Sequence, residues 1–472
     1  MASEESSFKP GSFNLAALAI KNFDGSEVVD MRATAQIVRI YEDIHEDTMS
    51  IEIDLADGQG LFADLPLCGD EVLEIAYKTG SDDMQTINLV FNLYRVSERK
   101  PLNDRLMAYT LYGVSQEAVT DLNVGVKESF NHEVPFDIVQ KIFDTHIKNA
   151  STNLDSGMSP GLPTNSVFNN VVYPTGKVLM QAGIEPAGDG QLMSWVGNGD
   201  SPFTTIRSVL NEAEGGLNKS STFLFWETKT GFVCGTLEDL ASNEVREKYI
   251  YVIKNIPPEN KRMSSYREYQ KVETLEIQPI FDTLDWMMDG GFGSTTKYID
   301  PVTKQYKEVP YVYGPGFNKE KETHVDQHPI INRNLKQKYE FDEIRSNLMW
   351  SDWIQKDCKY IKKRLASKQD WRRKQNNLSK KMSWFKNFES VKCHLAVPGN
   401  SELEAGDCID LFVPDSSGFA DKQDSSDRYV DAKFIISAIR HDIDIAGEKY
   451  TTFLECIKDS FPNALQNIPK KA

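Results

Sequence analysis

The chain has 472 residues, of which 40% are hydrophobic and 26% are charged, and its formal net charge at neutral pH is −17. At roughly 100–200 residues per domain, this composition predicts a globular protein of two to four domains. The negative charge argues against a general nucleic-acid-binding protein. The lack of any run of roughly 20 apolar residues argues against a membrane-spanning helix.

The first residues and the cysteines give a consistent picture of the compartment. Residues 1–13 have no basic flank and no apolar core, so we expect no secretory signal and a soluble protein that folds in a cytoplasm. Six cysteines are scattered along the chain without a CxxC pair. We therefore expect reduced, buried thiols rather than a zinc site or a redox motif.

The first quarter of the chain alternates apolar and polar residues. Residues 49–55 read Met-Ser-Ile-Glu-Ile-Asp-Leu, which is the period-two pattern of a strand with one buried face. Further strands are predicted at 72–77, 87–93 and 109–114. Short strands at regular spacing predict a sandwich or barrel over residues 12–120.

The middle of the chain carries helix signals and irregular stretches. Pro135 and Pro202 each stand where the first turn of a helix would begin, and apolar residues follow at helical spacing. We predict an α+β domain over residues 121–280, with an irregular insertion rich in Gly, Ser, Asn and Pro at 150–200. Residues 281–385 are predicted to form loops and a basic helical segment.

A second β-pattern fills residues 386–462 and repeats the order of the first. In each copy a Gly-Asp turn precedes an apolar strand, then a Phe-led strand, then a strand that begins Tyr-Thr. Two antiparallel sheets can look alike by chance, because alternation is common. The shared order favours two copies of one small β-domain at the two ends of the chain. The turn residues, for which we predict a structural role, are Gly69, Asp70, Gly406 and Asp407.

Two similar domains in one subunit have a geometric use. A ring of three such subunits presents six similar units, so it can meet a sixfold partner without a mismatch of symmetry.

The two β-blocks and the stretch SPFTTIRSVLNEAEGGLNKSSTFLFWETKTGFVCGTLEDL, residues 201–240, resemble the central baseplate hub proteins of contractile-tailed phages and of related injection machines. The resemblance implies an α+β, mainly β protein. Two similar tail-tube-like β-barrel or sandwich domains at the chain ends would flank α+β insertion domains.

The resemblance also implies a function. It implies a structural homotrimer, not an enzyme, whose pseudo-hexameric ring seats the spike protein below and continues into the tail tube or a tube-initiator protein above. Tape-measure and baseplate wedge proteins would be further partners, DNA would pass only in transit, and neither a membrane nor a cofactor would be involved. The protein would assemble in the host cytoplasm and reside in the baseplate of the virion.

Acidic residues on the predicted strands are candidates for the channel of such a ring. A negative wall would repel phosphates and keep DNA from adhering. The alternative is that these residues lie on a solvated outer face. The candidates are Glu52, Asp54, Glu71 and Glu74.

A basic stretch over residues 334–392 contrasts with the acidic remainder of the chain. Its tryptophans and basic residues suit nucleic acid, or a contact with acidic neighbours in an assembly. The acidic remainder favours the protein contact. The candidate interface residues are Lys362, Lys363, Arg364, Arg372, Arg373 and Lys374.

Catalytic and metal motifs are weak, and we predict no catalytic or metal-binding residue. The G-x-S-x-G match at 157–161 lacks the strand and helix of a nucleophile elbow. His324 and His328 have i,i+4 spacing, but Pro329 follows directly. His441 and Asp442 are best explained as a polar pair at a strand end. Two alternative functions stay open: a tail-associated cell-wall or polysaccharide hydrolase, and a nucleic-acid-binding tail-completion protein.

Overall fold

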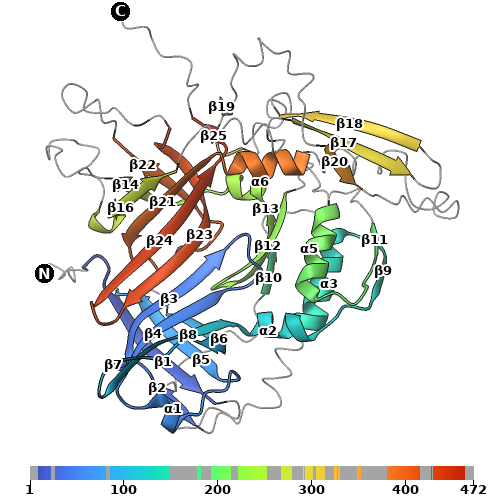
Figure 1. The fold of residues 1–472 in the computed structure, drawn as a ribbon. Coiled ribbons are helices and arrows are strands. Elements are labelled where there is room, and N and C mark those ends of the chain that lie inside the picture. Colours follow the sequence, from blue (N-terminus) through green and yellow to red (C-terminus); the bar gives the residue numbers. More distant parts are fainter. Residues whose placement is uncertain are drawn as a thin grey trace, which may run out of the picture.

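The protein is represented by a computed structural model. It describes residues 9–22, 27–80, 86–148, 178–181, 193–213, 222–251, 267–278, 291, 293–300, 305–313, 324–326, 328–329, 348–351, 380–414, 427 and 429–462. Strands predominate among these residues (Figure 1), which confirms a mainly β fold. No described helix combines the length and the apolar character that a membrane span would need.

The N-terminal part of the chain forms an antiparallel sheet in the order β3-β4-β8-β6-β5-β1-β2, with β7 added beside β8. As the period-two pattern predicts, Met49, Ile51, Ile53 and Leu55 are buried while the residues between them are half-exposed. The elements are β1 (Phe13–Lys21), β2 (Val28–Asp30), β3 (Ala35–Asp43), β4 (Ser50–Asp57), α1 (Leu61–Asp64), β5 (Val72–Thr79), β6 (Ile87–Val96), β7 (Lys100–Asn103) and β8 (Leu106–Ser115).

The middle of the chain forms a smaller α/β unit with its own core. Pro135 and Pro202 each occupy the start of a helix, as predicted. Phe143, Phe225 and Phe232 pack ring against ring inside this unit. The elements are α2 (Gln116–Asn123), β9 (Ser129–Glu133), α3 (Pro135–Ile142), η1 (Phe143–Lys148), β10 (Val178–Gln181), β11 (Met193–Val196), α5 (Pro202–Glu212), β12 (Phe223–Thr228), β13 (Gly231–Thr236) and α6 (Leu237–Ser242).

The C-terminal part forms a second group of strands with a separate hydrophobic core. Strands β14, β15 and β16 join this group, although they lie within the residues predicted as the middle domain. Helical residues 380–388 place Trp384 and Phe388 in the same core. Its elements are β14 (Val245–Tyr251), η3 (Glu268–Gln270), β15 (Lys271–Val272), β16 (Thr274–Ile277), β21 (Val391–Pro398), β22 (Cys408–Phe412), β23 (Ala432–Asp444) and β24 (Lys449–Lys458). Two further sheets are separate: β17 (Gly293–Asp300), β18 (Gln305–Val312) and β20 (Leu348–Ser351) form one, and β19 (His328–Pro329) and β25 (Ser460–Phe461) form the other.

One strand order occurs in both groups. Antiparallel pairs give β3-β4-β8-β6-β5 in the first group and β16-β21-β24-β23-β22 in the second. Each order carries a β-bulge at the matching place, between Leu93 and Arg95 in one and between Ile436 and Ala438 in the other. The groups differ at the next strand, because β1 is antiparallel to β5 whereas β14 is parallel to β22.

A seam joins the two groups into one 15-stranded sheet. Strand β23 pairs antiparallel with β3, from Ala438 opposite Asp43 to Asp444 opposite Ile37. Figure 1 shows these strands side by side where the red and blue parts of the ribbon meet. The cores interlock at the seam, because Ile443 and Tyr450 pack in the N-terminal core and Ile44 packs in the C-terminal core.

Candidate functional site

The hairpin β12–β13 of the middle unit inserts where the two strand groups meet. Trp226 is buried in the C-terminal core, and its indole N–H donates a hydrogen bond of 3.1 Å to the carbonyl of Ala405. The neighbouring Glu227 carboxylate accepts a 2.8 Å hydrogen bond from the backbone N–H of Met49, in the N-terminal group. Two consecutive residues of one strand therefore hold both groups.

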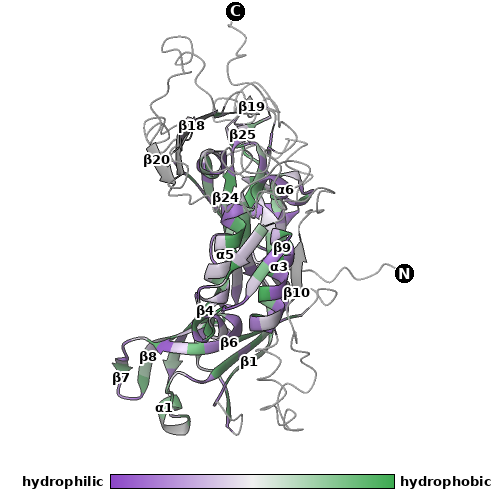
Figure 2. Cartoon of the chain, turned by 90° about the vertical axis from the view of Figure 1, so that its right-hand side faces the viewer, coloured by the Kyte–Doolittle hydropathy of each residue, from purple (hydrophilic) through white to green (hydrophobic). Residues whose placement is uncertain are grey.

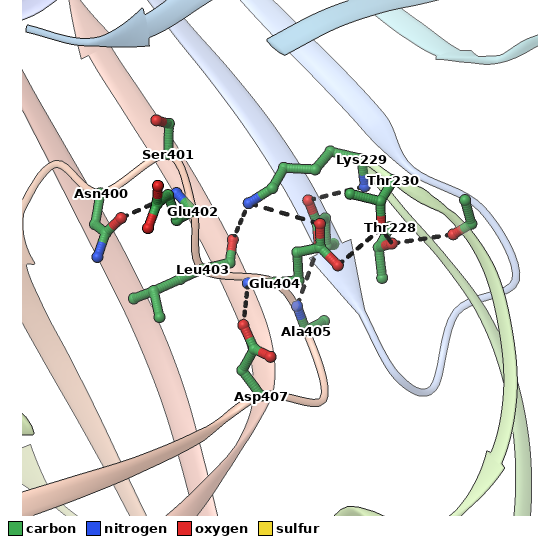
Figure 3. A network of polar contacts seen from close by, with 12 residues as sticks. Thr228, Lys229, Thr230, Asn400, Ser401, Glu402, Leu403, Glu404, Ala405 and Asp407 are labelled. Atoms are coloured by element: carbon green, nitrogen blue, oxygen red, sulfur yellow. Dashed lines mark hydrogen bonds and ion pairs between the residues drawn. The ribbon is translucent and has the colours of Figure 1, made fainter. Parts of the chain in front are cut away.

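A buried polar network surrounds the tip of this hairpin (Figure 3). The Lys229 ammonium donates to the carbonyl of Leu403 and lies 3.9 Å from a carboxylate oxygen of Glu404. The Glu42 carboxylate, from β3, accepts from the backbone N–H groups of Lys229 at 3.3 Å and Ala405 at 3.1 Å. The network thus ties three distant segments of the chain together.

Burial sets the protonation of this network. It raises the pKa of Glu42 to about 7, although Lys229 opposes this rise and Glu404 reinforces it. Burial also lowers the pKa of Lys229, against the attraction of Glu42 and Glu404. Breaking a buried pair costs more than the pair contributes. The three groups therefore act as a unit that requires one relative position of their segments.

A second set of polar contacts also holds the joint, by which we mean the region where the two strand groups and the β12–β13 hairpin meet. The Tyr450 hydroxyl and His441 Nδ1 lie 2.7 Å apart, and the ring of Tyr77 meets that of Tyr450 edge-on. Burial lowers the pKa of His441. Thr79, at the end of β5, exchanges hydrogen bonds of 2.7–3.2 Å with Ser401. The buried His441 points inward while its neighbour Asp442 lies on the half-exposed face, so these two side chains do not form an acid–base pair.

The predicted turn residues lie in two comparable turns. Gly69 and Gly406 both have positive φ, at +99° and +98°. Asp407 accepts a 2.9 Å hydrogen bond from the N–H of Glu404 and lies 3.5 Å from Arg246. Asp70 accepts a 3.0 Å hydrogen bond from the Cys68 thiol.

Two of the four predicted channel acids lie on a half-exposed sheet face. Glu52 and Asp54 flank Arg39, at 3.6 and 2.7 Å, and Asp442 of β23 lies 3.7 Å from the same guanidinium. This polar face crosses the seam between the strand groups. Its acids are ion-paired, so Arg39 offsets part of their negative charge.

The other two acids are buried. Glu71 precedes β5 and accepts hydrogen bonds from the N–H groups of Cys68 at 2.6 Å and Gly69 at 3.0 Å. Glu74 forms an ion pair with Lys21. Alternation alone suggests an exposed face for Glu74. Strand β5 is instead covered on both faces, because side chains that point to either face are buried. A strand also pairs with each of its two edges.

The structure places the motifs considered for metal binding, catalysis or interface contacts as follows. The buried His324 binds the Asp459 carboxylate through Nδ1, whereas His328 pairs through β19 with β25. Cys68, Asp70 and Glu71 bring potential metal ligands within 4.8 Å of one another. The turn hydrogen bonds described above account for that cluster. The 157–161 motif and the basic candidates Lys362, Lys363, Arg364, Arg372, Arg373 and Lys374 lie outside the described residues.

The buried network at the joint was not predicted from the sequence. Lys229 lies in the turn between β12 and β13, where a lysine is normally exposed. Glu42 differs from Glu52 and Asp54 because alternation along β3 places it on the same face as the buried Val38 and Ile40. A second signal is the two strongly apolar strands that flank the turn, which indicate a hairpin buried on both faces.

Comparison with known proteins identifies the fold. No protein-family model matches the chain, and no curated protein matches its sequence. Among solved structures, the chain is similar to the tail protein from Neisseria meningitidis MC58, with 10% identity, a TM-score of 0.50, and coverage of 95% of this chain and 97% of that one. It is also similar to the 43 kDa tail protein of prophage MuSo2 from Shewanella oneidensis, with 8% identity, a TM-score of 0.52, and coverage of 94% and 99%. The chain therefore has the fold of phage tail proteins over nearly its whole length, as its sequence resemblance implies.

Proposed function

We propose that this chain, which has the fold of phage tail proteins, is a structural hub subunit at the centre of a contractile-tail baseplate. Three copies form a pseudo-hexameric ring that joins a trimeric spike to a sixfold tail tube. The ring leaves a central passage for DNA. The protein works in the virion, through its interfaces and without chemistry of its own.

The observation that carries this proposal is the repeated strand order. Five strands in each group pair in one order, with a bulge at the matching place. Two comparable β-units in one subunit allow a threefold ring to present six comparable surfaces. In this proposal the first unit spans residues 12–120, and the second spans residues 386–462 with β16 added to it. The rest of residues 121–280 and residues 281–385 form the insertions between them.

The joint supports a structural role. Lys229, Glu42 and His441 have the shifted pKa values that often mark an active site. Here Glu42 and Lys229 are held by hydrogen bonds with the backbone, and His441 is held by the Tyr450 hydroxyl. These contacts fix the angle between the two β-units, which a ring requires of every subunit.

The polar face around Arg39 is the proposed lining of the passage. Glu52, Asp54 and Asp442 lie on one half-exposed face that runs through both β-units. A face of mixed charge with an acidic excess would let the phosphate backbone of DNA pass without adhering.

Negative-stain imaging of the purified protein tests the proposal. A ring with a central hole and six similar lobes is the expected result. If the protein alone is monomeric, the same imaging is repeated with a trimeric spike protein and with tail-tube protein. A chain that remains single in both mixtures would overturn the hub function. The partners further from the ring, tape-measure and baseplate wedge proteins, are tested by the same co-assembly.

A further inference from the structure

The seam between the two β-units starts at a definite place in each unit. Strand β23 leaves β22 after Ile435, bulges between Ile436 and Ala438, and pairs with β3 from Ala438 onwards. Strand β6 repeats this course, because it leaves β5 after Asn92 and bulges between Leu93 and Arg95. The residues that follow Arg95 are therefore the counterpart of the edge on which β3 pairs.

This counterpart edge is open. Residues 95–103 pair with β8 on one side, and within the described ranges no strand pairs with them on the other. All four residues of β7 are exposed, Leu102 by 61%. The β7–β8 hairpin extends away from the rest of the chain (Figure 2).

The counterpart of β3 is also open. Strand β16 pairs antiparallel with β21, as β3 pairs with β4. Among the described residues no strand pairs with the other edge of β16. Its last residue, Ile277, is 38% exposed. An open edge of backbone N–H and C=O groups is a template for another strand.

We infer that β16 of one copy pairs antiparallel with the open edge after Arg95 in the next copy, and that this pairing closes the ring. The inference rests on the proposed function, because it names the contact through which that ring is built. The occupant of each edge is a second copy of this chain. The contact is heterologous, and such contacts generate closed rings when the rotation closes.

The register of the contact follows from pairs within the chain. One row of laterally paired residues crosses the first unit, and a matching row crosses the second. In the first unit the row is Asn92, Val114, Ser50 and Tyr41. In the second unit the row is Ile435, Ile457, Lys392 and Gln278. Within the chain Tyr41 pairs with Arg440, five residues after Ile435. In the proposed contact, Asn92 takes the place of Ile435 and Gln278 takes the place of Tyr41. The residue five positions after Asn92, which is Ser97, therefore lies opposite Gln278.

Charge supports the pairing. In the seam within the chain, Arg39 of β3 lies 3.7 Å from Asp442 of β23. In the proposed contact the charges are reversed, because the basic residues lie on the open edge after Arg95 and the acid lies on β16. The open edge carries Arg95, Arg99 and Lys100 with a single acid, Glu98, and β16 carries Glu276 with no basic residue. Glu273, just before β16, is paired within the chain with Lys449 at 2.7 Å.

The contact also has a natural end. Pro101 lacks an N–H, so regular pairing stops there. An edge strand that ends in Lys-Pro resists indiscriminate pairing with other strands.

Cross-linking between introduced cysteines tests the register. The background is Cys68→Ser with Cys358→Ser, which leaves four native cysteines that are all buried, namely Cys234, Cys393, Cys408 and Cys456. One tagged chain carries Ser97→Cys, and a second, differently tagged chain carries Gln278→Cys. In the seam, Ile44 N–H donates to Ser437 and Ile445 N–H donates to Gln36. The pair of Tyr41 and Arg440 is therefore a non-hydrogen-bonded one, where Cα atoms lie about 4.5 Å apart, within disulfide range. Mild oxidation should link the two chains, and a matched mixture with Lys127→Cys in place of Gln278→Cys should not.

Charge reversal provides the second test. Lys100→Glu with Arg99→Glu, or Glu276→Lys alone, should raise the protein concentration needed for ring formation at least tenfold. The chain with all three changes should assemble again, and Lys127→Glu should behave as wild type. Rings that form normally without the cross-link and without sensitivity to these reversals would overturn the contact but leave the hub function intact. Failure of the wild type to form any ring, even with spike and tube proteins, would overturn both.

Discussion

Gly69 and Gly406 share one backbone conformation, with φ of +99° and +98°, but have different surroundings. A Cβ at Gly69 would meet nothing within 4 Å, whereas a Cβ at Gly406 would lie 2.9 Å from the Trp226 ring. Gly69→Ala should cost about 1 kcal/mol of unfolding free energy, from the left-handed conformation alone. Gly406→Ala should cost about 1–3 kcal/mol more, because the ring must shift. Urea denaturation of both variants checks this, and equal losses would contradict the difference.

Removal of the Trp226 ring should loosen the joint. Trp226→Ala leaves a cavity in the C-terminal core and should cost about 3–5 kcal/mol. Trp226→Phe keeps most of the apolar volume but removes the donor to the Ala405 carbonyl, so a loss of about 1–3 kcal/mol is expected. Denaturant unfolding measures both values. A Phe variant as stable as wild type would show that this hydrogen bond does not matter.

Glu42 should make the protein less stable as the pH rises. Its pKa is about 7 in the folded chain and near 4.5 in the unfolded chain. Between these values the folded state holds a proton that the unfolded state has released, so the free energy of unfolding falls with pH. The loss should be on the order of 3 kcal/mol by pH 8. Glu42→Gln, which mimics the protonated form, should match wild type near pH 4.5 and exceed it at pH 8. Parallel stability profiles for the two proteins would contradict this.

His441 should act in the opposite direction. Burial holds its pKa below the ordinary value near 6.5, so the unfolded state binds a proton that the folded state refuses. Its contribution to stability is complete above pH 6.5 and declines as the pH falls towards the folded pKa. His441→Asn, with an amide oxygen near the position of Nδ1, should lose stability less steeply below pH 6.5, by up to about 1.4 kcal/mol per pH unit. Thermal unfolding from pH 7 to 5 gives both slopes, and identical slopes would count against a neutral buried imidazole.

Local pattern predicts several of the strands, including β4, β5, β6 and β8, because alternation and turn chemistry are properties of short segments. The period-two face of β4 and the helix starts at Pro135 and Pro202 illustrate this. The order of strands after each Gly-Asp turn likewise carries over into the repeated sheet order.

The partners of these strands are not local. Strand β16 pairs with β21 across more than a hundred residues, and nothing in Thr274–Ile277 indicates that partner. The burial of Glu42 and Lys229 depends on three separate segments meeting at one place. Whether a strand acid is exposed depends on what covers it, which is why Glu52 is half-exposed and Glu74 is buried.

Arg39 provides the last prediction, because one guanidinium serves three carboxylates on the face that crosses the seam. Arg39→Met leaves Glu52 and Asp54 close together without their cation, while Asp442 keeps Arg440 at 3.1 Å. These side chains are only partly exposed, so a loss of about 1–2 kcal/mol is expected at low salt. Repulsion among the remaining acids is screened by salt, so the loss should shrink as ionic strength rises.

The control for this prediction is Arg32→Met, which removes a more exposed pair with Asp30. It should cost less than about 1 kcal/mol. Denaturant unfolding at low and high salt distinguishes the two variants. An Arg39 variant whose loss is as small as that of the control, or does not change with salt, would show that the acids on this face do not depend on Arg39.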